Sequence, residues 1–399
     1  MARWEELPAD LIIAISQHLE SYVDYVRLGA ICSSWNSAIP KSPTHLFKQI
    51  PWLMLPFDDE TQTSRSFYSI LDDKIYHLEL SETRGKLFRG SCYGWLVILE
   101  MSPALCLFNP LTKFKITLPP LDTFPDIKSY CPDNKDKEYT IFNCLHGVTR
   151  QWGQAYMREV YIKKLVLSSP PHDDYLAIAI FGEHRWLAFC KRNDNKWTAA
   201  ETCNRHGFED VIFYKDKIYA LESYGELLVS DMTSLPKFSL IAAEIPRLGS
   251  YAELNLVGSN NGLMMVQRYY IYDDDDDEPD GDESDGVVRY KTSRFKIHLL
   301  ESKSGEEMLK WSKITHLGDN VMFLGYNASV LIPSVGVPNL KRNCIYYTDF
   351  QMEWWEEDYY GGFDIGIFDL GNGRIKEFGE LNLSSEYVWT PPLWVVPNP

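Results

Sequence analysis

The chain has 399 residues, of which 45% are hydrophobic and 24% charged, and its formal net charge is -17. That length can hold a short module and one large domain with a sizeable core. Because affinity for nucleic acid comes largely from clustered Lys and Arg, the acidic balance excludes DNA and RNA as expected partners.

The first forty residues predict two short amphipathic helices. Pro8 suits a first helical position, and Asp10 adds negative charge near the positive end of the helix dipole, so a helix is expected to begin near Leu7. Its apolar stripe, and a second one after it, recur at helical spacing: Leu11, Ile12, Ile15 and Leu19, then Leu28, Ile31, Trp35 and Ile39. Two short helices cannot bury both stripes alone, so they are expected to pack on the main domain or on a partner.

Strand patterns replace helical ones after Pro43 and Pro51, because proline pushes its predecessor into extended conformations. From Phe67 onward the apolar runs are four to six residues long, as in 95–98 and 176–180. Turn signals such as Asn260-Asn261-Gly262 separate them. The strands are therefore expected to pair as antiparallel hairpins, with abundant aromatic residues on their faces.

A loose repeat of strand, turn and strand supports a radial arrangement. It recurs in residues 175–198, 210–240, 262–314 and 343–378. Such units cover one another when stacked around an axis as a β-propeller, and the chain length predicts roughly six or seven blades. A large β-sandwich is the alternative.

The segment from Asp273 to residue 286 carries a block of like charge and is expected to be a disordered loop. Its EF-hand spacing fails at the twelfth position, where Val287 stands in place of Glu, so calcium is not predicted. Recruitment of a basic partner is the functional alternative to a solvated loop.

The apolar tail from Tyr387 to Val396 is too hydrophobic for a free end. We expect it to pair with the sheet that begins the large domain, near residues 67–80, because pairing the first and last strands leaves no exposed edge.

Catalytic motifs are few. Gly90-Ser91-Cys92-Tyr93-Gly94 has the form of a nucleophile elbow, but a strand and not a helix is expected after it, so a tight turn is predicted. Cys203 and His206 could share a metal, yet no second pair lies nearby in the sequence. We therefore predict no catalytic, metal or cofactor-binding residues.

The eight Cys lie far apart, which suits free thiols in a reducing compartment. Acidic residues follow Met1 to Arg3, so no signal peptide is expected, and no apolar run is long enough to cross a bilayer. The protein is expected in the cytoplasm, the nucleus or both, without a membrane partner.

Two sets of strings carry a resemblance to known proteins. Leu7-Pro8-x-Asp10-Leu11, followed by Cys32-x-x-Trp35, resembles an F-box, the segment that docks onto the Skp adaptor of a cullin ubiquitin ligase. Residues 90–97, 107–112 and 118–121, with further strings to residue 370, resemble a plant family of F-box proteins with a C-terminal β-propeller. The acidic insert and residues 255–259 depart from the family pattern.

The resemblance implies a mainly β protein, with a short α-helical F-box in residues 1–45 and a large antiparallel β-propeller in residues 60–399. The block of like charge adds the expected disordered insert at residues 273–286. The resemblance also implies a set of adaptor-binding residues: Leu7, Pro8, Leu11, Ile12, Ile15, Leu19 and Trp35. Among these, Trp35 is expected to be a core anchor, and Leu7, Pro8, Leu11 and Ile15 the main contacts.

The implied function is the substrate-recognition subunit of a Skp, cullin and F-box ubiquitin ligase. The F-box would hold the adaptor, and through it a cullin and a RING subunit, while the propeller holds an unknown protein target. Such a receptor is not an enzyme and needs no cofactor, since it acts by raising the effective concentration of the target. The alternatives are a propeller scaffold without a ligase and a propeller enzyme with a central-channel site.

Overall fold

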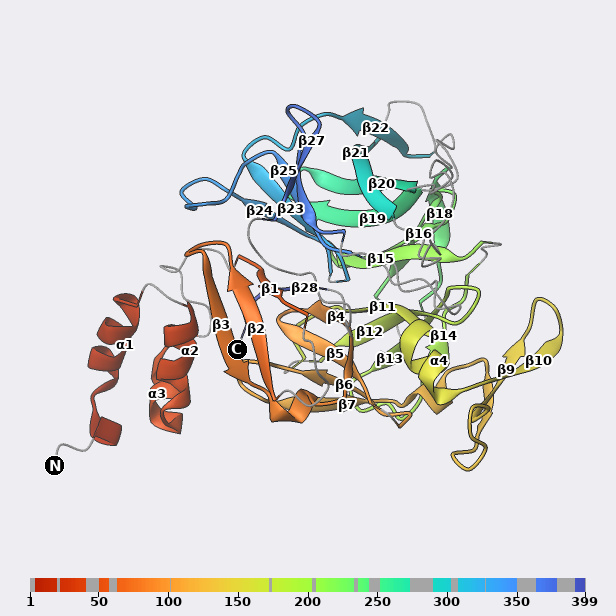
Figure 1. Ribbon diagram of the computed structural model, residues 1–399, viewed down its shortest axis with the longest axis horizontal. Coiled ribbons are helices and arrows are strands. Elements are labelled where there is room, and N and C mark those ends of the chain that lie inside the picture. The colour runs from red at the N-terminus through yellow and green to blue at the C-terminus, as the bar shows by residue number, and fades with distance from the viewer. Residues whose placement is uncertain are drawn as a thin grey trace, which may run out of the picture.

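The computed structural model describes residues 4–19, 22–40, 50–56, 63–100, 102–171, 174–202, 206–232, 236–243, 252–272, 290–302, 308–326, 328–349, 364–378 and 392–398. Short helices come first, followed by sheets of mainly antiparallel strands that confirm the mainly β fold (Figure 1). The helical elements are η1 (Trp4–Glu6), α1 (Ala9–Gln17), α2 (Tyr22–Ala30), α3 (Ser33–Ala38), η2 (Ser81–Thr83), η3 (Leu121–Thr123) and α4 (Gln154–Val160).

The N-terminal helices form a small core of their own. Pro8 is the N-cap of α1 and not its first helical residue, because its ψ of 143° is extended while its carbonyl accepts the first helical N–H groups. Asp10 lies in the first turn, as predicted. The second predicted helix is two helices, since the chain is extended at Cys32 between α2 and α3. Their buried side chains are Ile12, Tyr25, Leu28, Trp35 and Ile39.

Six sheets of four or five strands make up most of the described chain after α3. The first three are β28-β1-β2-β3, with β1 (Trp52–Met54), β2 (Ser64–Ser69), β3 (Lys74–Glu79) and β28 (Leu393–Val395); β4-β5-β6-β7, with β4 (Leu87–Cys92), β5 (Trp95–Leu99), β6 (Leu105–Phe108) and β7 (Lys115–Leu118); and β11-β12-β13-β14, with β11 (Ile162–Leu167), β12 (Leu176–Phe181), β13 (Trp186–Lys191) and β14 (Thr198–Ala199).

The other three sheets complete the ring. They are β15-β16-β17-β18, with β15 (Phe208–Tyr214), β16 (Lys217–Glu222), β17 (Leu227–Asp231) and β18 (Ser239–Ala242); β19-β20-β21-β22, with β19 (Ala252–Ser259), β20 (Gly262–Tyr272), β21 (Tyr290–Glu301) and β22 (Lys310–Ile314); and β24-β23-β25-β26-β27, with β23 (Asn320–Leu324), β24 (Val330–Pro333), β25 (Cys344–Tyr347), β26 (Gly366–Asp369) and β27 (Arg374–Glu377).

The sheets are the blades of a β-propeller. Strands at one edge of each sheet lie side by side around the ring, in the order β28, β4, β11, β15, β19 and β24. Apolar side chains fill the space between successive blades, and one such cluster joins the last blade to the first through Phe323 and Trp394. The six blades of the described residues agree with the smaller of the two predicted numbers.

The two ends of the propeller share the first blade. β28 pairs with β1, and β1 pairs with β2, so the tail joins the sheet that holds residues 67–80, as predicted. Its direct neighbour, however, is β1, which precedes residue 60, the start expected for the propeller. The short strand Trp52–Met54 is flanked by proline at residue 51, and this obscured it in the sequence.

The structure tests the local expectations for residues 90–94 and for residues 255–259. Residues 90–94 form the predicted tight turn, in which Tyr93 and Gly94 have positive φ and Cys92 lies opposite Trp95. Residues 255–259, which depart from the family pattern, belong to β19 and pair with β20 without a register shift. The acidic insert lies outside the described residues, apart from the strand ends that flank it.

A three-stranded sheet projects from the ring between the second and third blades. It consists of β8 (Ile127–Tyr130), β9 (Tyr139–Asn143) and β10 (Val148–Trp152), in the order β10-β9-β8. Figure 1 shows β9 and β10 on the opposite side of the molecule from α1 to α3. Helix α4 then leads the chain back into β11.

Candidate functional site

The structure divides the predicted adaptor-binding residues into an exposed set and a buried set. Leu11 and Ile15, one helical turn apart on α1, are 49% and 40% exposed, and Pro8 is exposed beside them in sequence. Leu7 and Leu19 are half-buried against the helical core. Ile12 and Trp35 are within that core, at 1% and 5% exposure.

Burial decides which of these residues can touch a partner without rearrangement of the helices. The Trp35 indole Nε1 donates to the backbone oxygen of Trp4 at 3.1 Å, so Trp35 fixes the N-terminal turn against α3. Its role is therefore that of the expected core anchor. Ile12 has the same structural role in α1.

Two further exposed apolar residues belong to this module. Trp4 is 66% exposed in η1, and Ile31 is 56% exposed between α2 and α3. Trp4 lies in η1, before the extended residue Pro8, so the helical spacing of α1 gave no signal for it. Large apolar residues gathered at the surface of a small module are typical of an interaction site. We call Leu11 and Ile15, together with the N-cap residue Pro8, the α1 surface.

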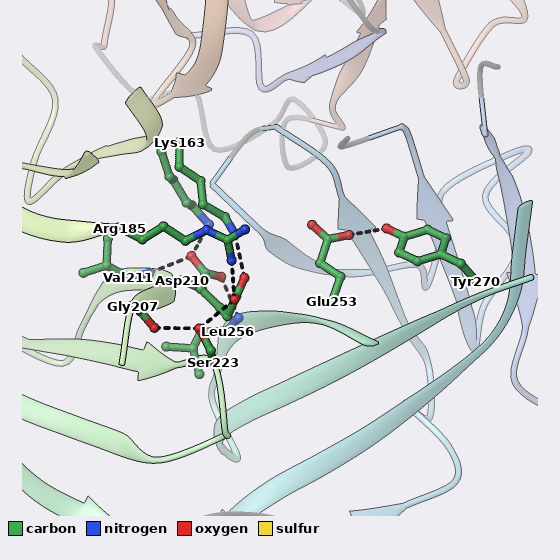
Figure 2. Close-up of polar contacts among 11 residues, drawn as sticks. Lys163, Arg185, Gly207, Asp210, Val211, Ser223, Glu253, Leu256 and Tyr270 are labelled. Carbon is green, nitrogen blue, oxygen red and sulfur yellow. Dashed lines mark hydrogen bonds and ion pairs between the residues drawn. The ribbon is translucent and has the colours of Figure 1, made fainter. Parts of the chain in front are cut away.

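The propeller has a charged cluster where β11, β15 and the β12–β13 turn meet (Figure 2). Lys163 Nζ lies 2.6 Å from Glu209 Oε2, and Arg185 pairs with the other carboxylate oxygen. Ser223 Oγ donates to the same carboxylate at 2.9 Å. Burial alone would raise the pKa of Glu209, but the two cations outweigh it and hold the pKa at about 2.

A second ion pair of this cluster is fully buried. Lys164 pairs with Asp210, whose other oxygen accepts the backbone N–H of Leu256 at 2.7 Å. Asp210 thus connects three consecutive blades through β11, β15 and β19. Figure 2 shows Lys163, Arg185 and Asp210 gathered in this cluster, with Glu253 and Tyr270 on one side of it.

Glu253 and Arg268 form a buried polar group in the next blade. The Arg268 guanidinium donates to Asp364 Oδ2 at 3.0 Å and lies 3.9 Å from Glu253, which accepts a hydrogen bond from Tyr270. Burial raises the pKa of Glu253 to about 7, although Arg268 opposes the shift. These side chains hold blades together and already have charged or hydrogen-bonding neighbours.

The structure describes two of the three residues that the sequence raised as candidates for catalysis or metal binding, Cys92 and His206. Cys92 is buried in β4, and burial raises the pKa of its thiol to about 11, the opposite of what a nucleophile needs. Cys203 lies outside the described residues, and His206 packs against the ring of Tyr224. Within the described ranges, no three His, Cys, Asp or Glu side chains gather in a way that could hold a metal ion.

Comparison with known proteins identifies the protein family of this chain. The family model for the KIB1-4 beta-propeller matches residues 67–369. The chain therefore belongs to the KIB1-4 β-propeller family.

Individual relatives extend the match to the helical module. The chain is 23% identical to the F-box protein At2g17036 of Arabidopsis thaliana, over 99% of this chain and 95% of that protein. It is also 23% identical to the Arabidopsis F-box protein SKIP23, over 99% and 96% of the two chains. Among solved structures, the β-propeller domain of Swd1 from Myceliophteria thermophila has a TM-score of 0.33 and 8% identity, over 81% and 84%. The relatives named F-box proteins thus match this chain from its helices through its propeller.

None of the helices in the described part of the chain has the length and apolar character needed to span a membrane.

Proposed function

We propose that this chain is the substrate-recognition subunit of a Skp, cullin and F-box ubiquitin ligase. The α1 surface docks onto the Skp adaptor, which brings the cullin and the RING subunit, and the propeller binds a protein target. The assembly acts in the cytoplasm, the nucleus or both. The exposure of Leu11 and Ile15, one helical turn apart on α1, is the observation that carries the proposal.

In this function the chain positions the target protein, and other subunits of the ligase make the bond between ubiquitin and the target. Holding a target lysine close to a ubiquitin-charged enzyme raises its effective concentration, and a properly oriented intramolecular reaction gains many powers of ten in rate. The neutralised ion pairs of the propeller suit a rigid platform of this kind.

Co-purification tests the proposal. The full chain, co-expressed with a plant Skp adaptor, is expected to purify as a stable complex. The double variant Leu11→Glu/Ile15→Glu should lose the adaptor, because two carboxylates would be desolvated in an apolar interface. A matched control is Leu240→Glu, an exposed leucine on strand β18 of the propeller, which should retain the adaptor. Retention by the double variant, with an unchanged melting temperature, would refute docking through α1.

A further inference from the structure

Three cations gather on one face of the outer strands of the fifth blade, which is made of β19 to β22. Arg294 and Lys296 are two residues apart on β21, so their side chains share a face. Lys313 of β22 lies directly opposite His298, the next residue of β21 on that face. Arg294 and Lys313 are exposed, and Lys296 is partly exposed. We call Arg294, Lys296 and Lys313 the basic surface.

Tyr269 of β20 brings two of these charges together. The Arg294 guanidinium carbon lies 4.6 Å from the centroid of the Tyr269 ring, and the Lys296 Nζ lies 4.9 Å from the same centroid. The Tyr269 hydroxyl donates to Gln267 Oε1 at 3.1 Å, which fixes the ring. Arg294 and Lys296 are therefore held over one aromatic ring.

No carboxylate balances the basic surface. Neither Arg294, Lys296 nor Lys313 forms an ion pair with any residue that the structure describes. The one carboxylate of β20, β21 and β22 is Glu301, which lies opposite Lys310 at the far end of β21. Burial, followed by the charges of Arg294 and Lys313, lowers the pKa of Lys296. An anion bound here gains the attraction of all three cations without competing with a carboxylate of the chain.

A buried histidine adds an unsatisfied polar atom to the same face. His298 is 7% exposed, and its Nδ1 atom has no hydrogen-bond partner among the described residues. Burial, followed by the charges of Lys296 and Lys313, lowers the pKa of its ring, so the imidazole is neutral near pH 7. A neutral imidazole can carry its proton on Nδ1 and donate it. An oxyanion between Lys296 and Lys313 can accept that proton in a hydrogen bond.

The number of cations indicates which anion fits the basic surface. A phosphoryl group carries about two negative charges and three acceptor oxygens at pH 7, whereas a carboxylate carries one charge. Arg294 can hold such a group through two parallel N–H groups. A nucleic acid or an anionic membrane presents many charges at once, and a chain of net charge -17 repels it. The ligand that fits is a single phosphoryl group on a protein segment.

The basic surface is open to a target while the adaptor is bound. Figure 1 shows β22 at the rim of the ring, away from α1, which carries the proposed adaptor contact. At one end of the surface, Leu300 and Trp311 pack against the fourth blade. At the other end, the exposed Lys291 continues the same face past a β-bulge. A target segment can therefore reach the basic surface without displacing the adaptor.

We propose that the basic surface binds a phosphorylated side chain of the protein target. The phosphoryl group lies between Arg294, Lys296 and Lys313, and His298 donates a hydrogen bond to it. This inference rests on the proposed function, because it states which modification marks a target for the receptor.

Retention of degenerate phosphopeptides by the purified full chain tests this inference. Each peptide library carries a fixed central phosphoserine, phosphothreonine or phosphotyrosine and is matched by the same library without the phosphate. At least one phosphorylated library is expected to be retained about tenfold more than its match. Equal retention within every pair of libraries would overturn the proposal.

Substitutions then locate the binding on the chain. Fluorescence anisotropy with one selected phosphopeptide should show about tenfold weaker binding to Arg294→Gln and to Lys296→Gln, because each loses a charged donor to the phosphate. Lys296→Arg keeps the charge and should retain most of the binding. Lys376→Gln, at an exposed lysine on the outermost strand of the last blade, is the matched control and should bind as the original chain does. Equal affinity of Lys296→Gln and Lys376→Gln, at one melting temperature, would contradict the proposed site.

Two further measurements address other anions. Inorganic phosphate alone should bind at least about tenfold more weakly than the selected phosphopeptide. Equal affinities would mean that the basic surface binds a free anion and no target segment. Replacing residues 273–285 of the acidic insert by a Gly-Ser linker should leave the phosphopeptide affinity unchanged. Binding that appears only after this replacement would mean that the insert, and not a target, occupies the basic surface.

Adaptor binding by the same preparations keeps the two proposals apart. Lys296→Gln is expected to co-purify with the Skp adaptor as the original chain does. A chain that binds the adaptor but does not prefer phosphorylated peptides refutes only the role of the basic surface. A chain that selects phosphopeptides but never binds the adaptor refutes only the ligase function.

Discussion

Leu53, in the first strand of the propeller, lies directly opposite Trp394, in the last, across the antiparallel pair of β1 and β28. Both side chains are fully buried. Trp394 packs against Phe323 of the last blade at 5.0 Å between ring centroids, while its backbone oxygen accepts a hydrogen bond from Ser91 of the second blade. One residue thus joins the first blade to both of its neighbours, and the ring depends on the end of the chain.

Loss of Trp394 should open the ring. We expect Trp394→Ala to lower the free energy of unfolding by about 3 to 5 kcal/mol, since a large buried aromatic leaves a cavity that collapses poorly. A truncation after Glu386 removes the whole strand and should aggregate or unfold. Urea denaturation measures the first effect and gel filtration the second. Phe114→Ala, at an exposed aromatic, is the control and should change stability little. A soluble, monomeric truncation with an unchanged melting temperature would contradict closure by β28.

Deletion of the acidic insert should be tolerated. Tyr272 and Tyr290 lie opposite each other at the ends of β20 and β21, so a short Gly-Ser linker in place of residues 273–285 can close the hairpin. A self-repelling acidic segment makes few native contacts, and loop length affects stability only weakly. The melting temperature is expected to stay nearly unchanged in a thermal scan. A large drop would mean that the insert packs on the propeller or holds an ion.

The buried pair of Lys164 and Asp210 should matter far more than an exposed pair of the same residue types. Asp210→Ala leaves the Lys164 charge buried, and breaking such a pair typically costs about 3 to 5 kcal/mol. Asp231→Ala breaks the exposed pair with Lys217 and should cost less than about 1 kcal/mol. Urea denaturation of the two variants gives the comparison. Equal effects would show that the connection between blades through Asp210 contributes little.

Glu253 should make stability depend on pH. Burial raises its folded-state pKa to about 7 from an ordinary value near 4.5, so between these pH values the folded state holds a proton that the unfolded state has lost. The stabilisation that protonated Glu253 gives the folded state is therefore present at low pH and is lost as pH rises through 7. Glu253→Gln stays neutral, so its stability relative to the original chain should increase between pH 5 and pH 8. Urea midpoints at several pH values test this, and a difference that does not vary with pH would contradict it.

Local patterns were sufficient to predict the class of fold and many of its hairpins. The turn at Tyr93 and Gly94 follows from residue types that tolerate positive φ, and β12 follows from an apolar run of strand length. β1 was missed because three residues beside prolines carry no periodic signal. The break at Cys32 was missed because the apolar spacing continues across it from Leu28 to Trp35.

The candidate sites depend on contacts that spacing does not encode. Leu11 and Ile12 are equally apolar neighbours, and only the packing of three helices separates the exposed one from the buried one. The charged cluster of the propeller joins Lys163, Arg185 and Glu209 from separate segments. Pairings between distant segments arise from the closed ring and the projecting sheet, so sequence reasoning gave no signal for them.

The affinity of the full chain for a Skp adaptor, measured by isothermal titration calorimetry, tests the central claim most directly. We predict that the original chain binds, that Leu11→Ala weakens binding at least about tenfold, or about 1.4 kcal/mol, and that Leu240→Ala does not change it. All three chains should share one melting temperature, because both leucines are exposed. No binding by the original chain, or equal affinity of the Leu11→Ala variant, would contradict the account.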